Sequence, residues 1–124
     1  MIGYVTLGTN DLDRAARFYD ALLGELGAKR MMASDRFVVW SVTPDRPALG
    51  VFVPYDGRPA MPGNGGMVAL AVDTPEKVAA LYRRAIELGA TDEGAPGPRG
   101  IPGFHAGYFR DLDGNKLNFF CFAS

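Results

Sequence analysis

The sequence has very few of the residues that form disulfides and metal sites, with one cysteine and one histidine among 124 residues. Cys121 has no partner for an intramolecular disulfide, which favours a reducing compartment. A formal net charge of −1 gives no electrostatic argument for binding nucleic acid or an anionic membrane. No apolar run is long enough to cross a bilayer, and no basic leader precedes the first strand-like segment. We therefore expect a soluble, cytoplasmic protein without nucleic-acid or membrane partners.

The composition that remains is that of an ordinary globular protein, with 48% hydrophobic and 22% charged residues. A chain of this length can bury enough surface for one self-sufficient domain, which we expect to span residues 1–124. A segment dense in proline and glycine divides it. The sequence thus predicts module one at about 1–56, a linker at about 57–66 and module two at about 67–124.

Hydrophobic periodicity predicts one strand, one helix and three strands in module one. Residues 2–8 alternate in polarity as a half-buried strand does. From Leu12 onward, apolar residues recur every three or four positions until two glycines end the pattern, which predicts an amphipathic helix. Three further strands are expected at 29–33, 37–43 and 49–53, because β-branched and aromatic residues are enriched there between turn residues.

The same order recurs in module two. A strand at 67–73 precedes a helix that begins with Thr74 as its N-cap. A weak strand at 91–93 and a loop at 94–103 follow. The chain closes with a hairpin over 107–120, whose turn contains the dipeptide Asp-Gly.

The two modules also match residue by residue, so they form an internal repeat. Val5-Thr6-Leu7 corresponds to Val68-Ala69-Leu70, and Leu26-Gly27-Ala28 corresponds to Leu88-Gly89-Ala90. One such unit cannot bury its inner sheet face alone, so two units should pair. The predicted fold class is α+β: two βαβββ modules forming a curved, mainly antiparallel sheet around a concave pocket, with the helices outside.

These features together resemble the vicinal oxygen chelate superfamily, which includes glyoxalase I, extradiol dioxygenases and bleomycin resistance proteins. The resemblance covers essentially the whole chain. It is carried by Asn10-Asp11-Leu12, by Phe18-Tyr19 and above all by the segment from Arg110 to Leu117 (Arg-Asp-Leu-Asp-Gly-Asn-Lys-Leu). The resemblance implies a homodimer, since many members complete their pockets across a subunit interface.

The resemblance also implies where a metal would bind, because metalloenzymes of the family place ligands at fixed strand positions. In this sequence those positions are Tyr4, Gly50, Met67 and Asn118. A hard divalent cation prefers imidazole nitrogen or carboxylate oxygen, and none of these residues supplies either. We therefore expect no metal cofactor and regard glyoxalase or dioxygenase activity of the metal-dependent kind as disfavoured.

Strand alternation instead predicts a mainly apolar ligand pocket with a few polar groups. The residues expected to line it are Tyr4, Thr6, Met67, Asn118 and Phe120, with Trp40, Phe52 and Tyr108 as additions of less certain facing. Core packing is an alternative role for most of these side chains.

Two polar residues near the terminal hairpin have open roles. His105 is either a general base at the pocket mouth or an exposed loop histidine, and the second is favoured because no carboxylate partner can be identified. Arg99 either holds an anionic ligand over the pocket or is a solvated loop residue. Asp111 and Asp113 are expected to be turn acceptors, and Cys121 a small buried hydrophobe.

The favoured hypothesis is a metal-free protein that binds a small, partly aromatic or apolar molecule. One alternative is a lyase, isomerase or dioxygenase of glyoxalase type, using atypical metal ligands or a metal-free proton transfer by Tyr4 or His105. A second alternative is a structural or regulatory dimer module.

Overall fold

A computed structural model describes residues 1–123, which divide into two compact units. Unit 1 comprises Met1–Pro62 and unit 2 begins at Gly63. Each unit contains one helix and one four-stranded mixed sheet, so the fold is α+β with two βαβββ modules, as the sequence predicted. No helix among these residues is long and apolar enough to cross a membrane.

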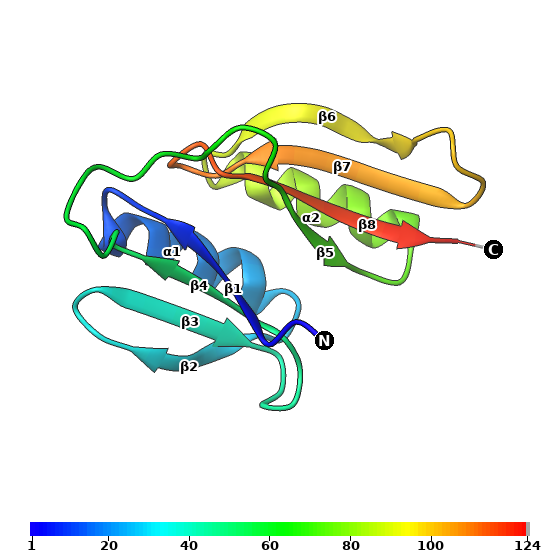
Figure 1. Ribbon diagram of the computed structural model, residues 1–124. Coiled ribbons are helices and arrows are strands. Elements are labelled where there is room, and N and C mark those ends of the chain that lie inside the picture. Colours follow the sequence, from blue (N-terminus) through cyan, green and yellow to red (C-terminus); the bar gives the residue numbers. More distant parts are fainter. Residues whose placement is uncertain (124) are drawn as a thin grey trace. The chain divides into compact units, whose positions relative to one another are not determined.

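Unit 1 contains β1 (Tyr4–Gly8), α1 (Leu12–Gly24), β2 (Lys29–Ala33), β3 (Phe37–Ser41) and β4 (Ala48–Phe52) (Figure 1). The strands of its sheet, sheet A, lie in the order β1-β4-β3-β2. β1 and β4 are parallel, whereas the other neighbours are antiparallel.

Unit 2 repeats this arrangement with β5 (Val68–Ala71), α2 (Pro75–Glu87), β6 (Thr91–Pro98), β7 (Phe104–Arg110) and β8 (Lys116–Phe122). Its sheet, sheet B, has the order β5-β8-β7-β6, with β5 and β8 parallel. The internal repeat seen in the sequence is therefore a repeat of topology.

Both helices begin after a capping side chain, and for α2 this is Thr74, as the sequence predicted. The side chain of Asp11 accepts a hydrogen bond from the backbone N–H of Arg14 at 3.1 Å, and Thr74 accepts one from the N–H of Lys77 at 3.1 Å. Each bond satisfies a backbone donor that the first helical turn would otherwise leave without a partner.

The core of each unit lies between its helix and one face of its sheet. In unit 1 this core consists of α1 residues packed on β3 and β4, and in unit 2 of α2 residues packed on β7 and β8. The fully buried large side chains of these two cores are Tyr19, Leu22, Trp40 and Val51 in unit 1, and Val78, Phe109, Leu117 and Phe119 in unit 2. We call the other face of each sheet, which the helix of its own unit does not cover, the open face.

The prediction of a loop from residue 94 to 103 was wrong in its first half, since β6 extends to Pro98. Its glycines and prolines are tolerated because β6 is the edge strand of sheet B, where some backbone N–H groups need no ladder partner. The register with β7 shifts on both sides of Gly94, so the strand is irregular.

The predicted hairpin turn is confirmed between β7 and β8. Gly114 has φ of +88°, a conformation that glycine adopts without steric cost. The buried carboxylate of Asp111 accepts bonds from the backbone N–H groups of Asp113 and Asn115, both at 2.9 Å, which confirms Asp111 as a turn acceptor. Cys121 is buried, as expected.

Candidate functional site

The open face of sheet A is formed by alternate residues of its strands. Trp40 donates a hydrogen bond to Asp20 of α1, so its neighbour Val39 projects to the other side of β3. Val39 pairs with Gly50 in the ladder, and Gly50 pairs with Thr6 of β1. These residues, together with Tyr4, Phe37 and Phe52, share the open face.

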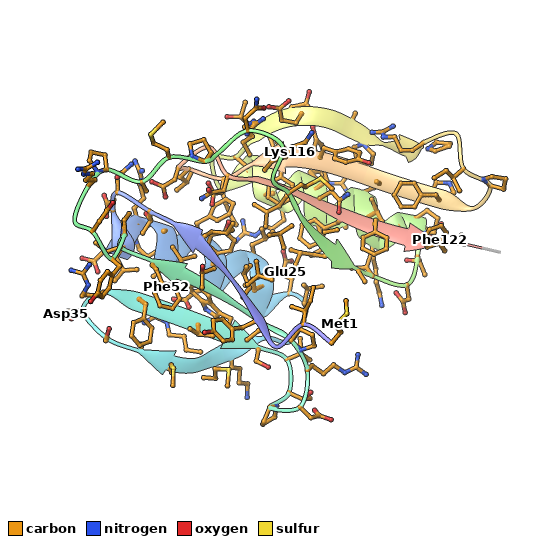
Figure 2. All side chains as sticks on the ribbon, viewed as in Figure 1. Met1, Glu25, Asp35, Phe52, Lys116 and Phe122 are labelled. Atoms are coloured by element: carbon orange, nitrogen blue, oxygen red, sulfur yellow. The ribbon has the colours of Figure 1, made fainter. Side chains whose placement is uncertain are left out.

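Two aromatic rings lie at the centre of this face. Phe37 and Phe52 stack with their centroids 4.9 Å apart and their planes 16° from parallel. Phe52 lies on β4 (Figure 2). An added Cβ at Gly50 would come within 2.6 Å of its ring, which therefore lies back over Gly50. The absence of a side chain at Gly50 is therefore what allows Phe52 to cover this part of the strand.

A pocket of about 430 Å³ lies on one side of the aromatic pair. A register shift in β2 between Arg30 and Met32 lets the adjacent residues Met31 and Met32 both contribute to it. The pocket is lined mainly by apolar side chains, with Arg46 as the charged one: Gly3, Tyr4, Met31, Met32, Phe37, Val39, Pro44, Arg46, Ala48 and Phe52. Such a lining suits an apolar small molecule.

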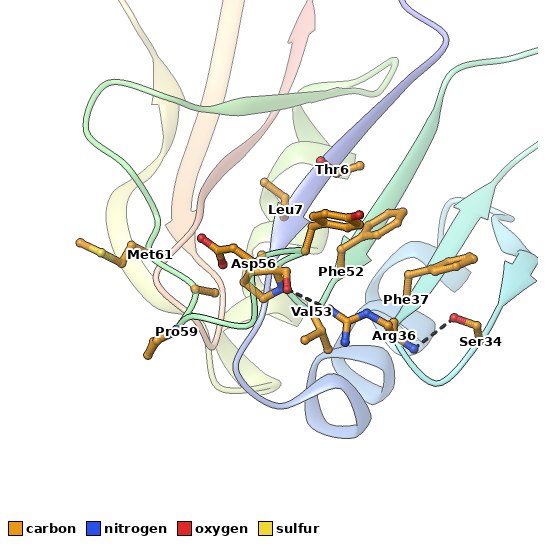
Figure 3. Close-up of a pocket in the computed structure, with 14 residues that line it drawn as sticks. Thr6, Leu7, Ser34, Arg36, Phe37, Phe52, Val53, Asp56, Pro59 and Met61 are labelled. Carbon is orange, nitrogen blue, oxygen red and sulfur yellow. Dashed lines mark hydrogen bonds between the residues drawn. The ribbon is translucent and has the colours of Figure 1, made fainter.

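A second pocket of about 680 Å³ is also lined by these two rings, and its other lining residues differ from those of the first pocket (Figure 3). Thr6 and the polar residues Ser34 and Arg36 line it, together with the beginning of the linker. The guanidinium of Arg36 donates to the carbonyl of Pro54 at 2.9 Å, which fixes part of the wall.

The linker is fastened beside this second pocket by Asn10. Its side-chain amide donates to the carbonyl of Ala60 at 3.1 Å and accepts from the N–H of the same residue at 2.6 Å. Gly8 makes room for this contact, since a Cβ there would lie 3.0 Å from the Cβ of Ala60. The predicted linker is thus a loop, and its part around Ala60 is held by Asn10 and forms a wall of the second pocket.

The open face of sheet B is more polar at its centre. Tyr108 of β7 pairs with Asn118 of β8, and Asn118 pairs with Ala69 of β5. Asn118 is only 2% exposed, and its Oδ1 atom is buried without a hydrogen-bond partner. A buried acceptor in this state is unfavourable, because it has lost water without gaining a donor.

An aromatic cluster lies beside Asn118 toward the end of β8. Phe120 was predicted to share the face of Asn118, and its ring centroid lies 6.0 Å from that of Phe104 and 6.2 Å from that of Phe122. Met67 precedes β5 and is 44% exposed. Neither Phe120 nor Met67 lines the two pockets of unit 1.

The expectation that Trp40 lines a ligand pocket is corrected by its place in β3. It lies on the helix side of sheet A, 2% exposed, and its Nε1–H donates to Asp20 at 2.8 Å. Asp20 also accepts two bonds from the guanidinium of Arg30, at 3.0 and 2.8 Å. The bond from Arg30, and to a smaller extent that from Trp40, lowers the pKa of the Asp20 carboxyl.

His105 also differs from both of its predicted roles. It lies within β7 and pairs with Cys121, so alternation places it on the face of sheet B that carries Phe109 and Phe119. Its Nδ1 lies 3.2 Å from the carbonyl oxygen of Gly103. His105 is therefore a half-buried strand residue on the opposite face from Asn118, and it is not a loop residue.

Several residues of the site were not identified from the sequence. Phe37, Met31 and Met32 line the pocket of unit 1, and Asn10 holds the linker. Phe37 and Trp40 are three residues apart on β3, so they point to opposite faces. Phe37 could therefore have been assigned to the pocket if Trp40 had been known to face the helix. The bulge in β2 and the pairing of Asn10 with Ala60, 50 residues away, have no local sequence signal.

The four positions that the resemblance assigns to metal ligands do not provide a suitable set, since Tyr4 offers only a phenol and the other three offer neither imidazole nor carboxylate. Gly50 has no side chain, and the ring of Phe52 fills the space above it. Met67 offers only a thioether, and Asn118 a neutral amide. Among residues 1–123, no three His, Cys, Asp or Glu side chains cluster as metal ligands would.

Comparison with known proteins places this fold and sequence in one group. A model of the Glyoxalase/Bleomycin resistance protein/Dioxygenase superfamily matches residues 1–119. A glyoxalase/bleomycin resistance protein from Albidiferax ferrireducens T118 is 35% identical, with a TM-score of 0.88 and 98% of each chain covered. No match was found among curated proteins.

More distant structures share the fold. A glyoxalase-related enzyme from Fulvimarina pelagi is 22% identical with a TM-score of 0.78, covering 98% of this chain and 87% of its own. A glyoxalase/bleomycin resistance protein/dioxygenase family enzyme from Burkholderia phytofirmans PsJN is 21% identical with a TM-score of 0.79, covering 97% of each chain. At these identities the likeness concerns architecture alone.

Proposed function

Because this chain belongs to the glyoxalase/bleomycin resistance protein/dioxygenase superfamily, we propose that it is a binding protein for a small, partly aromatic or apolar molecule. The ligand binds on the open face of sheet A, against Phe37 and Phe52. Binding requires no metal, since the four family positions offer no suitable ligand set. The protein forms a homodimer in the cytoplasm.

The observation that carries the proposal is the stacked aromatic pair, which lines both pockets. A planar ligand can stack on or beside these rings, and an aromatic contact contributes about 0.5–1.5 kcal/mol beyond the area that it buries. Burial of on the order of 200 Å² of apolar ligand surface contributes about 5 kcal/mol before the cost of association. These terms sum to about 5.5–6.5 kcal/mol before the cost of association is subtracted, so we expect a dissociation constant weaker than about 10 μM.

A proton-transfer enzyme is less well supported. The sequence offered His105 as a candidate general base for such an enzyme. In the structure His105 shares a face of sheet B with Cys121, and Asn118 lies on the opposite face. Tyr4 does line the apolar pocket, but within residues 1–123 no acid or base hydrogen-bonds its hydroxyl group. Binding without catalysis therefore accounts better for the residues on the open faces.

The proposal is tested by screening planar aromatic compounds for a rise in melting temperature, followed by calorimetric titration of those that raise it. We expect Phe52→Leu to weaken binding about tenfold, because it keeps apolar volume but removes the stacked ring. The matched control is Phe122→Leu, which removes an exposed aromatic residue of unit 2. Equal weakening by both variants would contradict the proposed site.

Metal content is measured separately, by elemental analysis of protein purified without chelators. We expect less than stoichiometric Zn²⁺, Ni²⁺, Mn²⁺ and Fe²⁺. A stoichiometric metal lost in the Asn118→Ala or Tyr4→Ala variant would overturn the metal-free part of the proposal. Sedimentation analysis tests the homodimer.

A further inference from the structure

The second half of strand β6 consists of small residues that leave room for the side chain of Arg99. This half, Gly94-Ala95-Pro96-Gly97-Pro98, contains no long side chain. The side chain of Arg99, the next residue, lies back along this bare strand: an added Cβ at Gly94 would come within 3.4 Å of its Nη2, and one at Gly97 within 3.7 Å of its Nη1. The glycines therefore leave room for the guanidinium on the strand.

The backbone holds this guanidinium in place. Nη1 donates to the carbonyl of Pro98 at 3.2 Å, and Nη2 donates to the carbonyl of Ala95. A guanidinium has five N–H donors in a planar fork, so these two bonds position the group while leaving further donors available.

A second cation approaches the same point from β8. Arg99 Cζ lies 5.3 Å from the centroid of the Tyr108 ring, and Lys116 Nζ lies 5.5 Å from the same centroid. Both distances are in the range of cation–π attraction. Neither cation has a carboxylate within ion-pair distance among the described residues.

The neighbouring acid does not neutralise them. Glu93 lines the same recess, but its carboxylate is bonded to the guanidinium of Arg110. The recess has a volume of about 670 Å³ and is lined by Glu93, Gly94, Ala95, Pro96, Arg99, Tyr108 and Lys116. Two positive charges around one aromatic ring therefore give the recess a positive potential.

We propose that Arg99, Lys116 and Tyr108 form an oxyanion-binding site of unit 2, which takes the carboxylate or phosphate group of a small molecule. The guanidinium donates through its fork, the ammonium supplies a second charge, and the phenol ring holds both cations in position. The site lies wholly within unit 2 and does not depend on the apolar pocket of unit 1.

The site is tested by titrating ¹⁵N-labelled protein with inorganic phosphate, and separately with acetate, while following backbone amide shifts. We expect saturable shifts at Gly94, Ala95, Gly97 and Tyr108, and the anion that binds more tightly identifies the class of group. Arg99→Gln and Lys116→Gln should each raise the Kd about tenfold, because each removes one charge-assisted partner. Arg99→Lys, which keeps the charge but loses the fork, should give a smaller increase.

The matched control is Arg83→Gln, which removes an exposed charge from α2 in the same unit and should leave the Kd unchanged. The proposal is overturned if neither anion gives saturable shifts at these amides. It is also overturned if Arg83→Gln weakens binding as much as Arg99→Gln and Lys116→Gln do. Loss of aromatic-ligand binding in the Phe52→Leu variant bears only on the proposed function, so the two failures are distinguishable.

Discussion

The two units share one scaffold but present different chemistry on their open faces. In unit 1 the ladder pair Val39 and Gly50 lies at the centre of the face, and the equivalent pair in unit 2 is Tyr108 and Asn118. The next pair along is Phe37 and Phe52 in unit 1. The equivalent of this second pair in unit 2 is Ala106 and Phe120, so the two units differ most at the centre of the face, where unit 1 has a valine and a glycine and unit 2 has a phenol and an amide.

The helix sides of the sheets show much less divergence. Both units bury aromatic and aliphatic residues there, and each links its helix to its sheet by a polar bond near the surface. In unit 1 the bond joins Asp20 to Trp40, and in unit 2 it joins Tyr82 to Asp92 at 2.6 Å. A repeated fold can therefore keep its core while a few open-face positions change what each half binds.

The largest effect is expected at the polar centre of unit 2. Asn118→Asp should lower the unfolding free energy by about 3 kcal/mol at pH 7, because it puts a carboxylate where the amide oxygen already lacks a donor. The loss should be smaller at pH 5, where the buried carboxyl can take up a proton. Urea unfolding followed by circular dichroism measures both values.

The control for this change is Asn64→Asp, which introduces the same charge at an exposed position of the linker. It should alter the unfolding free energy by less than about 0.5 kcal/mol. Equal stability of Asn118→Asp and the native protein at pH 7 would show that position 118 is solvated.

A somewhat smaller effect is expected when unit 1 is given the residue of unit 2. Gly50→Asn brings its Cβ within 2.6 Å of the Phe52 ring and 3.1 Å of Val39, so we expect a loss of about 2 kcal/mol. Unfolding followed by the fluorescence of Trp40, which is buried in unit 1, provides the measurement.

A double-mutant cycle shows whether the Phe52 ring causes this loss. Combined with Phe52→Ala, the change at Gly50 should cost less than it does alone, because the crowding has been removed. Gly66→Asn is the control, since an added Cβ at Gly66 meets nothing within 4 Å. Additive costs at Gly50 and Phe52 would contradict the idea that the glycine exists to accommodate the ring.

The smallest expected effect is on the pH dependence of stability, in which the two bonds that link helix to sheet should act at opposite ends of the pH range. Burial, and then the hydrogen bond to Asp92, raise the pKa of Tyr82 from 10.0 to about 12. This link should stabilise unit 2 fully below pH 10 and lose its contribution as the pH rises through 12. The lowered pKa of Asp20 acts in the opposite direction: its contribution is present above pH 3.8 and is lost as the pH falls.

Unfolding free energies measured from pH 9 to pH 12 test the alkaline part. Tyr82→Phe should remove part of the decline, whereas Tyr55→Phe, at a fully exposed tyrosine, should leave it as it is. An unchanged slope in Tyr82→Phe would mean that the hydroxyl is not held in the folded state.

Local patterns in the sequence were sufficient to predict most of the scaffold. Apolar spacing located both helices, Thr74 marked the start of the second, and the order of elements along the chain was predicted for both modules. The segment from Gly94 to Pro98 misled because glycine and proline are typical of loops, whereas an edge strand with register shifts also tolerates them.

The site was harder to predict than the scaffold because facing depends on tertiary contacts. Trp40 was expected in the ligand pocket, and His105 either at the pocket mouth or on an exposed loop, but both lie on the helix sides of their sheets. Alternation shows which residues of a strand share a face, but it does not show which face packs against the helix. For β3 the sequence gave no residue whose side of the sheet was already known. In β2 a bulge breaks the alternation itself, so both Met31 and Met32 reach the pocket.

The paired bonds between Asn10 and Ala60 have a consequence for how this chain can vary. They divide the connection between the units into a part that lines the second pocket, which includes Ala60 and Met61, and a following stretch from Pro62 to Gly66 that no regular strand or helix contains. Inserted residues in the later stretch would leave the pocket wall intact, while an insertion before Ala60 would shift it. We therefore expect this connection to tolerate changes in length after the pocket wall but not before Ala60.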